Sequence, residues 1–347
     1  MAFKPVKFTR KVQLTGGSTL TVSLPKEWVK VINLKQGDEV HIYMLPDNTL
    51  KIVPAKAIKP PVLETSIRIS RTMSPGACVR EFTSRYLLGF NIIRVSFDER
   101  TDVHRKVLRE TIMRRMIGVE VVEESADEFV VQVLTDYRSL PVRQALQRMA
   151  RTASNMLEDV LPNIVEQDRK ILLDVIERDN VVDKFYLFLS RQINAVMLGL
   201  ALPSEIGVED LLTATLLRAC AKSIERVADH AASIARILTL TPGGSIKASG
   251  KDIVEEVLKM GDISHNLFNE ALNALFKSNP ILAHHVIDKV AIVRGIEYKI
   301  LRKIVELKQY PQAIVALRTV IESLRRVADY SADISEVVID LNSEKPS

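Results

Sequence analysis

The chain has 347 residues, of which 47% are hydrophobic and 26% are charged, and its formal net charge at neutral pH is +5. A chain of this length can bury two or three separate cores, and this composition excludes a disordered or fibrous protein. No apolar run reaches the length of a membrane span, the N-terminus has no secretory signature and only two cysteines are present, so we expect a cytoplasmic protein with reduced thiols and no membrane insertion.

The positive charge is concentrated in the first 59 residues, which contain 10 Lys/Arg and 4 Asp/Glu. The rest of the chain contains 38 basic and 39 acidic residues. This asymmetry indicates a small polyanion-binding module attached to a nearly neutral body.

The N-terminal region, residues 1–56, has the pattern of short strands. Val12 and Leu14 alternate with polar residues before a Thr-Gly-Gly turn, and apolar residues alternate again from Leu20. The stretch PKEWVKVI predicts a short helix opened by proline, and two more strands are expected within residues 35–54. A unit of about 50 residues has little core of its own, so we expect it to form a homodimer.

The middle region, residues 57–138, predicts a small α/β domain. Apolar alternation and helical periodicity distinguish its elements. Strands are expected at 63–70, 91–97, 119–125 and 128–134, and helices at 74–88 and 101–116. The region contains no glycine-rich phosphate loop and no nucleophile elbow, so it is interpreted as a spacer or a sensor of an unknown ligand.

The remainder of the chain is helical and internally duplicated. At an offset of 100 residues, 217–234 and 317–334 share nine identities, including the motif RVAD, and an upstream helix repeats at a slightly longer offset. A Gly/Ser/Pro-rich stretch near residues 242–250 separates the two copies. This pattern predicts two tandem three-helix bundles, at 139–241 and 247–342, in a multidomain and mainly α protein.

The first copy carries two pairs of carboxylates at helical spacing. Asp179 and Asp183 share one helix face, and Glu225 and Asp229 share a face of the next helix, nearly opposite its main apolar stripe. Like charges at this spacing repel, so positive charge is expected between them. Two hypotheses remain open: a surface salt-bridge lattice with neighbouring Lys and Arg, or a site for Mg²⁺, Mn²⁺ or iron, which prefer such oxygen ligands.

The two helices that carry ERDNVVDKF and ERVADHAASIA resemble the PhoU family of phosphate-uptake regulators, over roughly residues 140–342. The resemblance implies two tandem three-helix bundles that bind metal through acidic E/D-x-x-x-D motifs. It implies a divalent or ferric ion (Mg, Mn, Fe or Zn) in the first bundle, with the ligands Asp179, Asp183, Glu225 and Asp229.

The second bundle departs from this family pattern. Val290, Arg294 and Arg325 stand where three carboxylates would be, which leaves Asp329. We therefore expect Arg294 and Arg325 to pair with Asp329, and we expect no metal in this bundle.

The stretch RKVQLTGGSTLTVSLPKEWVKVINLKQGDEV resembles the AbrB/SpoVT swapped-hairpin DNA-binding domains, over about residues 5–54. The resemblance implies a homodimeric barrel that contacts double-stranded DNA through Arg10 and Lys11 on the first strand and Lys26 and Lys30 on the short helix. Arginine is suited to reading guanine, whereas lysine more often contacts phosphate. The alternative is that these charges only solvate a small module that dimerises or binds a protein.

Taken together, the two resemblances imply a non-enzymatic, DNA-binding transcriptional regulator of phosphate uptake, in a domain combination of archaeal type. The alternative is an adaptor that regulates phosphate transporter components through protein contacts, with the hairpin domain only dimerising it. A metal-dependent hydrolase is disfavoured, because no nucleophile or general base accompanies the carboxylates.

Overall fold

The computed structural model of the chain describes residues 6–44, 48–56, 62–305 and 311–344. The chain divides into two compact units, residues 1–61 and residues 62–344. Each unit is described separately. No helix in the described part of the chain has an apolar stretch long enough to cross a membrane.

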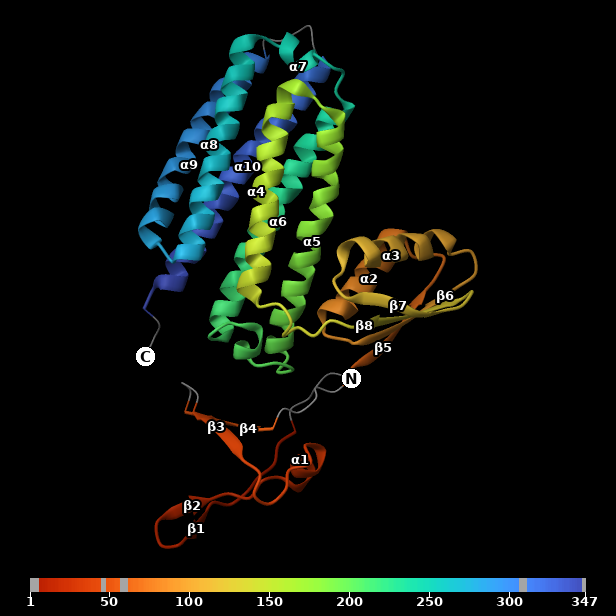
Figure 1. Ribbon diagram of the computed structural model, residues 1–347, viewed down its shortest axis with the longest axis vertical. Coiled ribbons are helices and arrows are strands. Elements are labelled where there is room, and N and C mark those ends of the chain that lie inside the picture. The colour runs from red at the N-terminus through yellow and green to blue at the C-terminus, as the bar shows by residue number, and fades with distance from the viewer. Residues whose placement is uncertain (1–5, 45–47, 57–61, 306–310, 345–347) are drawn as a thin grey trace. The chain divides into compact units, whose positions relative to one another are not determined.

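The first unit consists of two antiparallel β-hairpins separated by a short helix (Figure 1). Its elements are β1 (Gln13–Thr15), β2 (Thr19–Thr21), α1 (Lys26–Val31), β3 (Val40–Met44) and β4 (Leu50–Pro54). The first hairpin turns at Gly16 and Gly17, whose φ angles are 63° and 84°. Glycine adopts such angles without steric cost, which suits the three-residue loop of Gly16, Gly17 and Ser18 between the paired strands. The predicted order of elements is confirmed.

Large hydrophobic side chains of the first unit are exposed. Val12, Leu14 and Leu20 on or beside the first hairpin are 63%, 65% and 70% exposed, and Met44 on β3 is 79% exposed. No described residue of this unit is classed as buried. A single copy therefore has an apolar surface without a core, as its length predicts.

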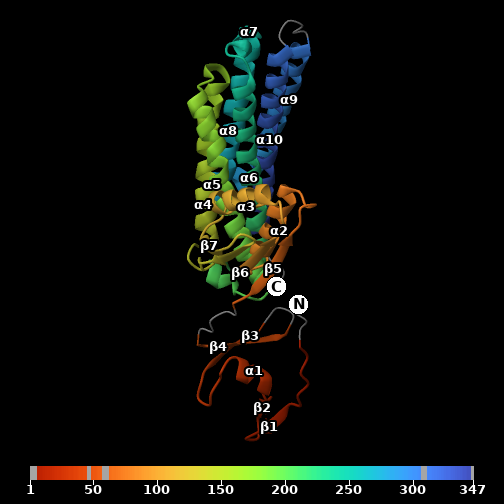
Figure 2. The ribbon, with the colours of Figure 1, turned by 90° about the vertical axis from the view of Figure 1, so that its right-hand side faces the viewer.

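The second unit begins with a two-layer α/β domain. Its elements are β5 (Glu64–Ile69), α2 (Pro75–Leu87), β6 (Ile92–Phe97), α3 (Asp102–Arg115), β7 (Val119–Glu124) and β8 (Glu128–Val133). The strand order is β5-β6-β8-β7, in which β5 and β6 are parallel and β8 is antiparallel to both neighbours. Helices α2 and α3 cover one face of the sheet (Figure 2), where Phe82, Tyr86 and Phe129 form the centre of the core. The predicted strands and helices are confirmed.

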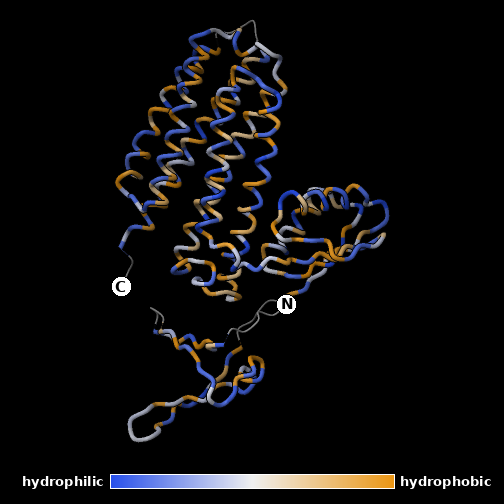
Figure 3. The backbone as a smooth tube through the Cα atoms, viewed as in Figure 1, coloured by the Kyte–Doolittle hydropathy of each residue, from blue (hydrophilic) through white to orange (hydrophobic). Residues whose placement is uncertain are grey.

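Six long helices form the rest of the unit and run side by side (Figures 1 and 2). They are α4 (Val142–Glu166), α5 (Arg169–Met197), α6 (Leu211–Leu240), α8 (Lys251–Lys277), α9 (Pro280–Val305) and α10 (Pro311–Asn342), with short helices η1 (Pro203–Ile206) and α7 (Ser245–Ala248) in the connections. Hydrophobic and hydrophilic residues alternate along each long helix with every turn (Figure 3), as amphipathic helices in a bundle require.

The turn between α4 and α5 contains neither glycine nor proline. Gln167 ends α4 in the left-handed conformation, with φ of 53°, and Asp168 caps α5 by accepting hydrogen bonds from the amides of Lys170 and Ile171. Aspartate is a favourable N-cap because its side chain satisfies amides that have no partner within the helix.

The duplication extends to all three helices of each bundle. Helices α4 and α5 correspond to α8 and α9 at an offset of 111 residues, and α6 corresponds to α10 at an offset of 100. Helix α6 packs against α10, and α4 packs against α8. His230 and its counterpart Tyr330 lie with ring centroids 5.9 Å apart, and Ser154 Oγ lies 3.0 Å from Nε2 of its counterpart His265. Residues that meet their own counterparts lie near a pseudo-twofold axis, so the two bundles pack face to face.

The α/β domain is docked on α5 of the first bundle. The buried guanidinium of Arg191 donates hydrogen bonds to the carbonyl oxygens of Tyr86 and, at 3.0 Å, Gly89. The Asn194 amide donates to the carbonyl oxygen of Leu87 at 2.9 Å, and Leu187 packs against the α/β core. These contacts satisfy carbonyls at the C-terminal end of α2, where a helix has no internal donors left. They join the α/β domain to the helical body in one unit.

Candidate functional site

The four carboxylates of the first bundle lie at the interface between α5 and α6. Asp179 and Glu225 are only 5% and 8% exposed, whereas the side chain of Asp229 is 38% exposed. Glu225 is therefore buried although it lies nearly opposite the main apolar stripe of α6, so a salt-bridge lattice that includes it is not confined to the protein surface. Helix α6 packs its apolar stripe against α4 and α10 and its opposite side against α5, so both sides of the helix are covered.

Each carboxylate has a basic partner. The pairs are Asp179 Oδ2 with Arg236 Nη2 at 3.1 Å, Asp183 Oδ2 with Arg115 Nη1 at 3.2 Å, Glu225 Oε1 with Lys222 Nζ at 2.6 Å, and Asp229 Oδ2 with Arg226 Nη1 at 3.3 Å. The salt-bridge lattice is thus present. We call the four carboxylates of bundle 1 (Asp179, Asp183, Glu225 and Asp229) the acidic cluster.

These partners do not fully offset burial and mutual repulsion in the acidic cluster. Burial, reinforced by the neighbouring carboxylates, raises the pKa of Asp183 to about 6 although Arg115 opposes the shift. Burial also raises the pKa of Asp179, with Asp229 adding to the increase, and the pKa of Glu225. The ionised cluster would therefore be stabilised by more positive charge.

One carboxylate oxygen of the acidic cluster is available as a ligand for an additional cation. Asp179 Oδ1 is buried and has no hydrogen-bond partner among the described residues, which is uncommon for a carboxylate oxygen. In the same described part of the chain, no three Asp, Glu, His or Cys side chains already converge as a ligand set. A cation bound here would have to displace some of the basic partners. The residues that would hold it are those of the acidic cluster, and the cation would supply charge neutralisation.

The second bundle has the internal ion pairs that its sequence predicts. Arg294 Nη2 lies 3.2 Å from Asp329 Oδ1, and Arg325 pairs with the other oxygen of Asp329. Arg326 Nη1 lies 3.4 Å from that same oxygen. Arg325 Nε also lies 3.2 Å from Glu297 Oε1, a partner that sequence reasoning missed. In the duplication, Glu297 corresponds to Tyr186 of the first copy. A position-by-position comparison of the two copies would therefore have shown a carboxylate that is present in the second copy alone.

The basic residues predicted to contact DNA are exposed in the first unit. All four side chains are open to solvent; they are Arg10, Lys11, Lys26 and Lys30. The ion pair found among the described residues of this unit joins Lys56 to Asp38 and involves none of the four. Lys26 and Lys30 are four apart on α1 and share one side of it. Arg10 and Lys11 precede β1, which begins at Gln13, so their expected place on the first strand is corrected. The pairing of β1 with β2 covers only three residues.

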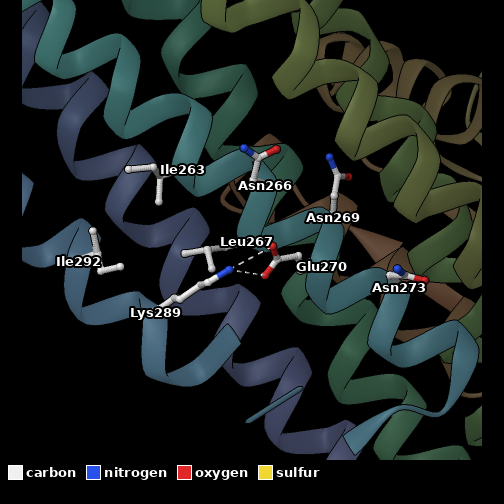
Figure 4. Close-up of a pocket in the computed structure, with 8 residues that line it drawn as sticks. All are labelled: Ile263, Asn266, Leu267, Asn269, Glu270, Asn273, Lys289 and Ile292. Atoms are coloured by element: carbon white, nitrogen blue, oxygen red, sulfur yellow. Dashed lines mark hydrogen bonds and ion pairs between the residues drawn. The ribbon is translucent and has the colours of Figure 1, made fainter. Parts of the chain in front are cut away.

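A groove between α8 and α9 is a second candidate (Figure 4). Its volume is about 440 Å³, and Ile263, Leu267 and Ile292 supply its apolar lining. Lys289 Nζ reaches both oxygens of Glu270 at 3.3 Å. The counterpart pair in the first bundle is Arg178 with Asp159, so this ion pair recurs with the duplication and is a feature of the repeat.

The α/β domain has a groove of its own between α3 and β7. Its volume is about 440 Å³, and Arg109, Met113, Met116 and Glu124 are among the residues that line it. Met113 is 69% exposed. The groove combines apolar and charged side chains, and a small ligand would fit it.

Two family models match this chain, one in the helical bundles and one in the N-terminal unit. The PhoU domain model matches residues 146–238 and 257–338, about half of the chain, and the model described as "Antidote-toxin recognition MazE, bacterial antitoxin" matches residues 13–60. The chain belongs to the PhoU family and carries an N-terminal domain of the MazE/AbrB swapped-hairpin type. The family is one of non-enzymatic accessory regulators, in agreement with the sequence-based prediction.

Individual relatives match about half of the chain. The phosphate-specific transport system accessory protein PhoU homolog of Clostridium acetobutylicum is 24% identical over 204 residues, which is 58% of this chain and 90% of that protein. The corresponding protein of Serratia marcescens is 27% identical over 154 residues, 44% of this chain and 60% of its own length. The crystal structure of PhoU from Pseudomonas aeruginosa has the same fold, with a TM-score of 0.50 and 21% identity over 58% of this chain and 94% of that one.

Proposed function

We propose that this chain is a cytoplasmic, homodimeric transcriptional regulator of phosphate uptake that binds double-stranded DNA. The observation that carries the proposal is the joining of an exposed basic hairpin unit to a PhoU body in one chain. The proposed domains are residues 1–56 for DNA binding, 57–138 for the α/β domain, and 139–241 and 247–342 for the two bundles.

The first unit supports both dimerisation and DNA binding. Its strands expose Val12, Leu14 and Leu20, and interleaving with a second copy would bury them. Arg10, Lys11, Lys26 and Lys30 are exposed, so phosphate contacts cost no existing ion pair described in the unit. Light scattering should give about twice the chain mass of 39.0 kDa, and a monomer with a folded N-terminal unit contradicts the interleaved dimer.

The acidic cluster of bundle 1 is proposed to bind a divalent or ferric ion. The buried, partnerless Asp179 Oδ1 and the raised pKa of Asp183 support it, because both indicate that the cluster lacks positive charge. Carboxylate oxygens suit Mg²⁺, Mn²⁺ and iron, and zinc also accepts them. No ion is proposed for bundle 2, where Arg294 and Arg325 already neutralise Asp329.

A second candidate function is an adaptor that regulates a phosphate transporter through protein contacts. The names of the matched relatives, which are phosphate-specific transport system accessory proteins, favour it. Binding to the chain's own promoter region, measured over a range of salt concentrations with and without phosphate and divalent metal, separates the two functions. A regulator must show affinity that falls steeply with salt, and absence of DNA binding at low salt favours the adaptor.

A further inference from the structure

The partner of Asp183 comes from a different domain. Arg115 is the last residue of α3 in the α/β domain, and its Nη1 lies 3.2 Å from Asp183 Oδ2 while its Nε donates to Asn180 Oδ1 at 3.0 Å. The other basic partners of the acidic cluster all lie on α6 itself; they are Lys222, Arg226 and Arg236. Arg115 is thus the partner through which the acidic cluster contacts the α/β domain.

The α/β domain is attached to α5 in two different ways. At the end of α2, the attachment is buried: Arg191 is only 4% exposed, and its guanidinium binds backbone carbonyls. At the end of α3, the attachment is polar and open, because the side chains of Arg114 and Arg115 are 60% and 49% exposed and bind Glu177 and Asp183. The two attachments therefore differ in how far their arginines are open to solvent.

We propose that Arg115 competes with a cation for the acidic cluster, so that cation binding releases the end of α3 from α5 while the end of α2 stays docked. This inference rests on the proposed cation binding by the cluster. Asp183 Oδ2 accepts from Arg115, and a dication coordinated by the same oxygen would repel that guanidinium and weaken this ion pair.

The second bundle contains a carboxylate whose basic partners all lie within the bundle itself. Asp329 is bound by Arg294 and Arg325, which lie on α9 and α10 at the positions of Asp183 and Glu225. Its cations are built into the two helices, so no ligand can displace them without breaking the bundle's own ion pairs. In bundle 1 the cation partner of Asp183 belongs to a domain that can move away.

The released segment also forms part of the α/β groove. Met113 and Met116 flank Arg114 and Arg115 in sequence and line the groove between α3 and β7. Movement of the end of α3 would therefore change this groove. Cation binding in the bundle would thus affect the α/β domain. By reciprocity, a ligand whose affinity for this groove depends on the cation would change the cation affinity by the same factor.

The test is a calorimetric titration of the full-length protein with Mn²⁺, comparing Arg115→Ala with Arg114→Ala. Arg114 is the matched control, because it lies on the same turn and carries the same charge but pairs with Glu177, outside the acidic cluster. Loss of a half-exposed competing ion pair should lower the Kd for Mn²⁺ about fivefold in Arg115→Ala and leave it within about twofold in Arg114→Ala.

A second readout distinguishes release from a merely structural role of Arg115. In the wild type, Mn²⁺ should increase amide hydrogen exchange in residues 110–118 and leave residues 84–90 protected, and it should change neither in Asp229→Asn. Equal Kd values for the two arginine variants, or increased protection of residues 110–118, overturn the inference alone. Mn²⁺ binding by Arg115→Ala but not by the wild type supports it, whereas no binding by any variant refutes the cation site and the inference together.

Discussion

Asp229 and Asp329 occupy the same position in the two repeats, yet their replacement by asparagine is expected to have different effects on stability. Asp329 is 13% exposed and accepts from Arg294, Arg325 and Arg326, whereas Asp229 is 38% exposed and accepts from Arg226 at 3.3 Å. Asp329→Asn should therefore destabilise the protein, while Asp229→Asn in the absence of metal should be neutral or slightly stabilising, because it removes charge beside other carboxylates.

The magnitude follows from the exposure of the partners. A charge-assisted hydrogen bond contributes about 1.5–3 kcal/mol, and a fully buried ion pair that loses one partner costs about 3–5 kcal/mol. Arg294 is 65% exposed and Arg325 keeps Glu297, so neither arginine is left buried without a partner. We therefore expect Asp329→Asn to cost about 2 kcal/mol, and Asp229→Asn less than about 0.5 kcal/mol.

Differential scanning calorimetry in EDTA measures both variants under conditions in which no metal contributes. For a unit of about 280 residues, a loss of about 2 kcal/mol should lower the transition temperature by roughly 3–4 °C. The control is the same pair of variants in high salt, where the difference should shrink because the half-exposed arginines are screened. A loss in Asp229→Asn equal to or larger than that in Asp329→Asn refutes the reasoning.

Three further predictions concern other parts of the chain. Asp229→Asn should abolish bound divalent metal in elemental analysis of purified protein, while the corresponding change in bundle 2 should not; equal metal content in the wild type and the variant leaves only the salt-bridge lattice. Replacing Lys26 and Lys30 by alanine should weaken DNA binding for all sequences and reduce the slope of log affinity against log salt by about four for the homodimer, which loses both lysines in each copy. Arg10→Ala should cost about 1–3 kcal/mol at one base and relax sequence preference. Wild-type affinity in all of these variants places any DNA contacts elsewhere. Burial lowers the pKa of His265 in the folded state, so below its unfolded pKa of about 6.5 the unfolded chain binds a proton that the folded chain does not, and stability falls as the pH drops. His265→Gln should therefore lose less of its transition temperature between pH 7.5 and 5.5 than the wild type, and an equal loss shows that other groups dominate.

Much of the architecture is a consequence of local sequence pattern. The alternation around Gly16 and Gly17 predicts the first hairpin, because a strand has a side-chain period of two and a tight turn needs positive φ. Helical periodicity predicts α2 and α3, and the repeated RVAD motif predicts two bundles. The pairing of Asp329 with Arg294 and Arg325 was also predictable, because comparing the two copies shows where carboxylates have been replaced by arginines.

Other features depend on contacts between residues far apart in the chain. The burial of Glu225 arises because α5 covers the side of α6 that its apolar stripe leaves free. The pairing of Arg115 with Asp183, across 68 positions, arises because Arg191 docks the end of α2 on α5 and so brings α3 beside the acidic cluster. Period and spacing are properties of one element, and they identified the four carboxylates. Spacing also accounts for Lys222 and Arg226, which lie on α6 three residues before Glu225 and Asp229. Only the packing of one element on another decided the partners of Asp179 and Asp183, because the position of a guanidinium on another helix or in another domain depends on docking contacts that no local pattern encodes.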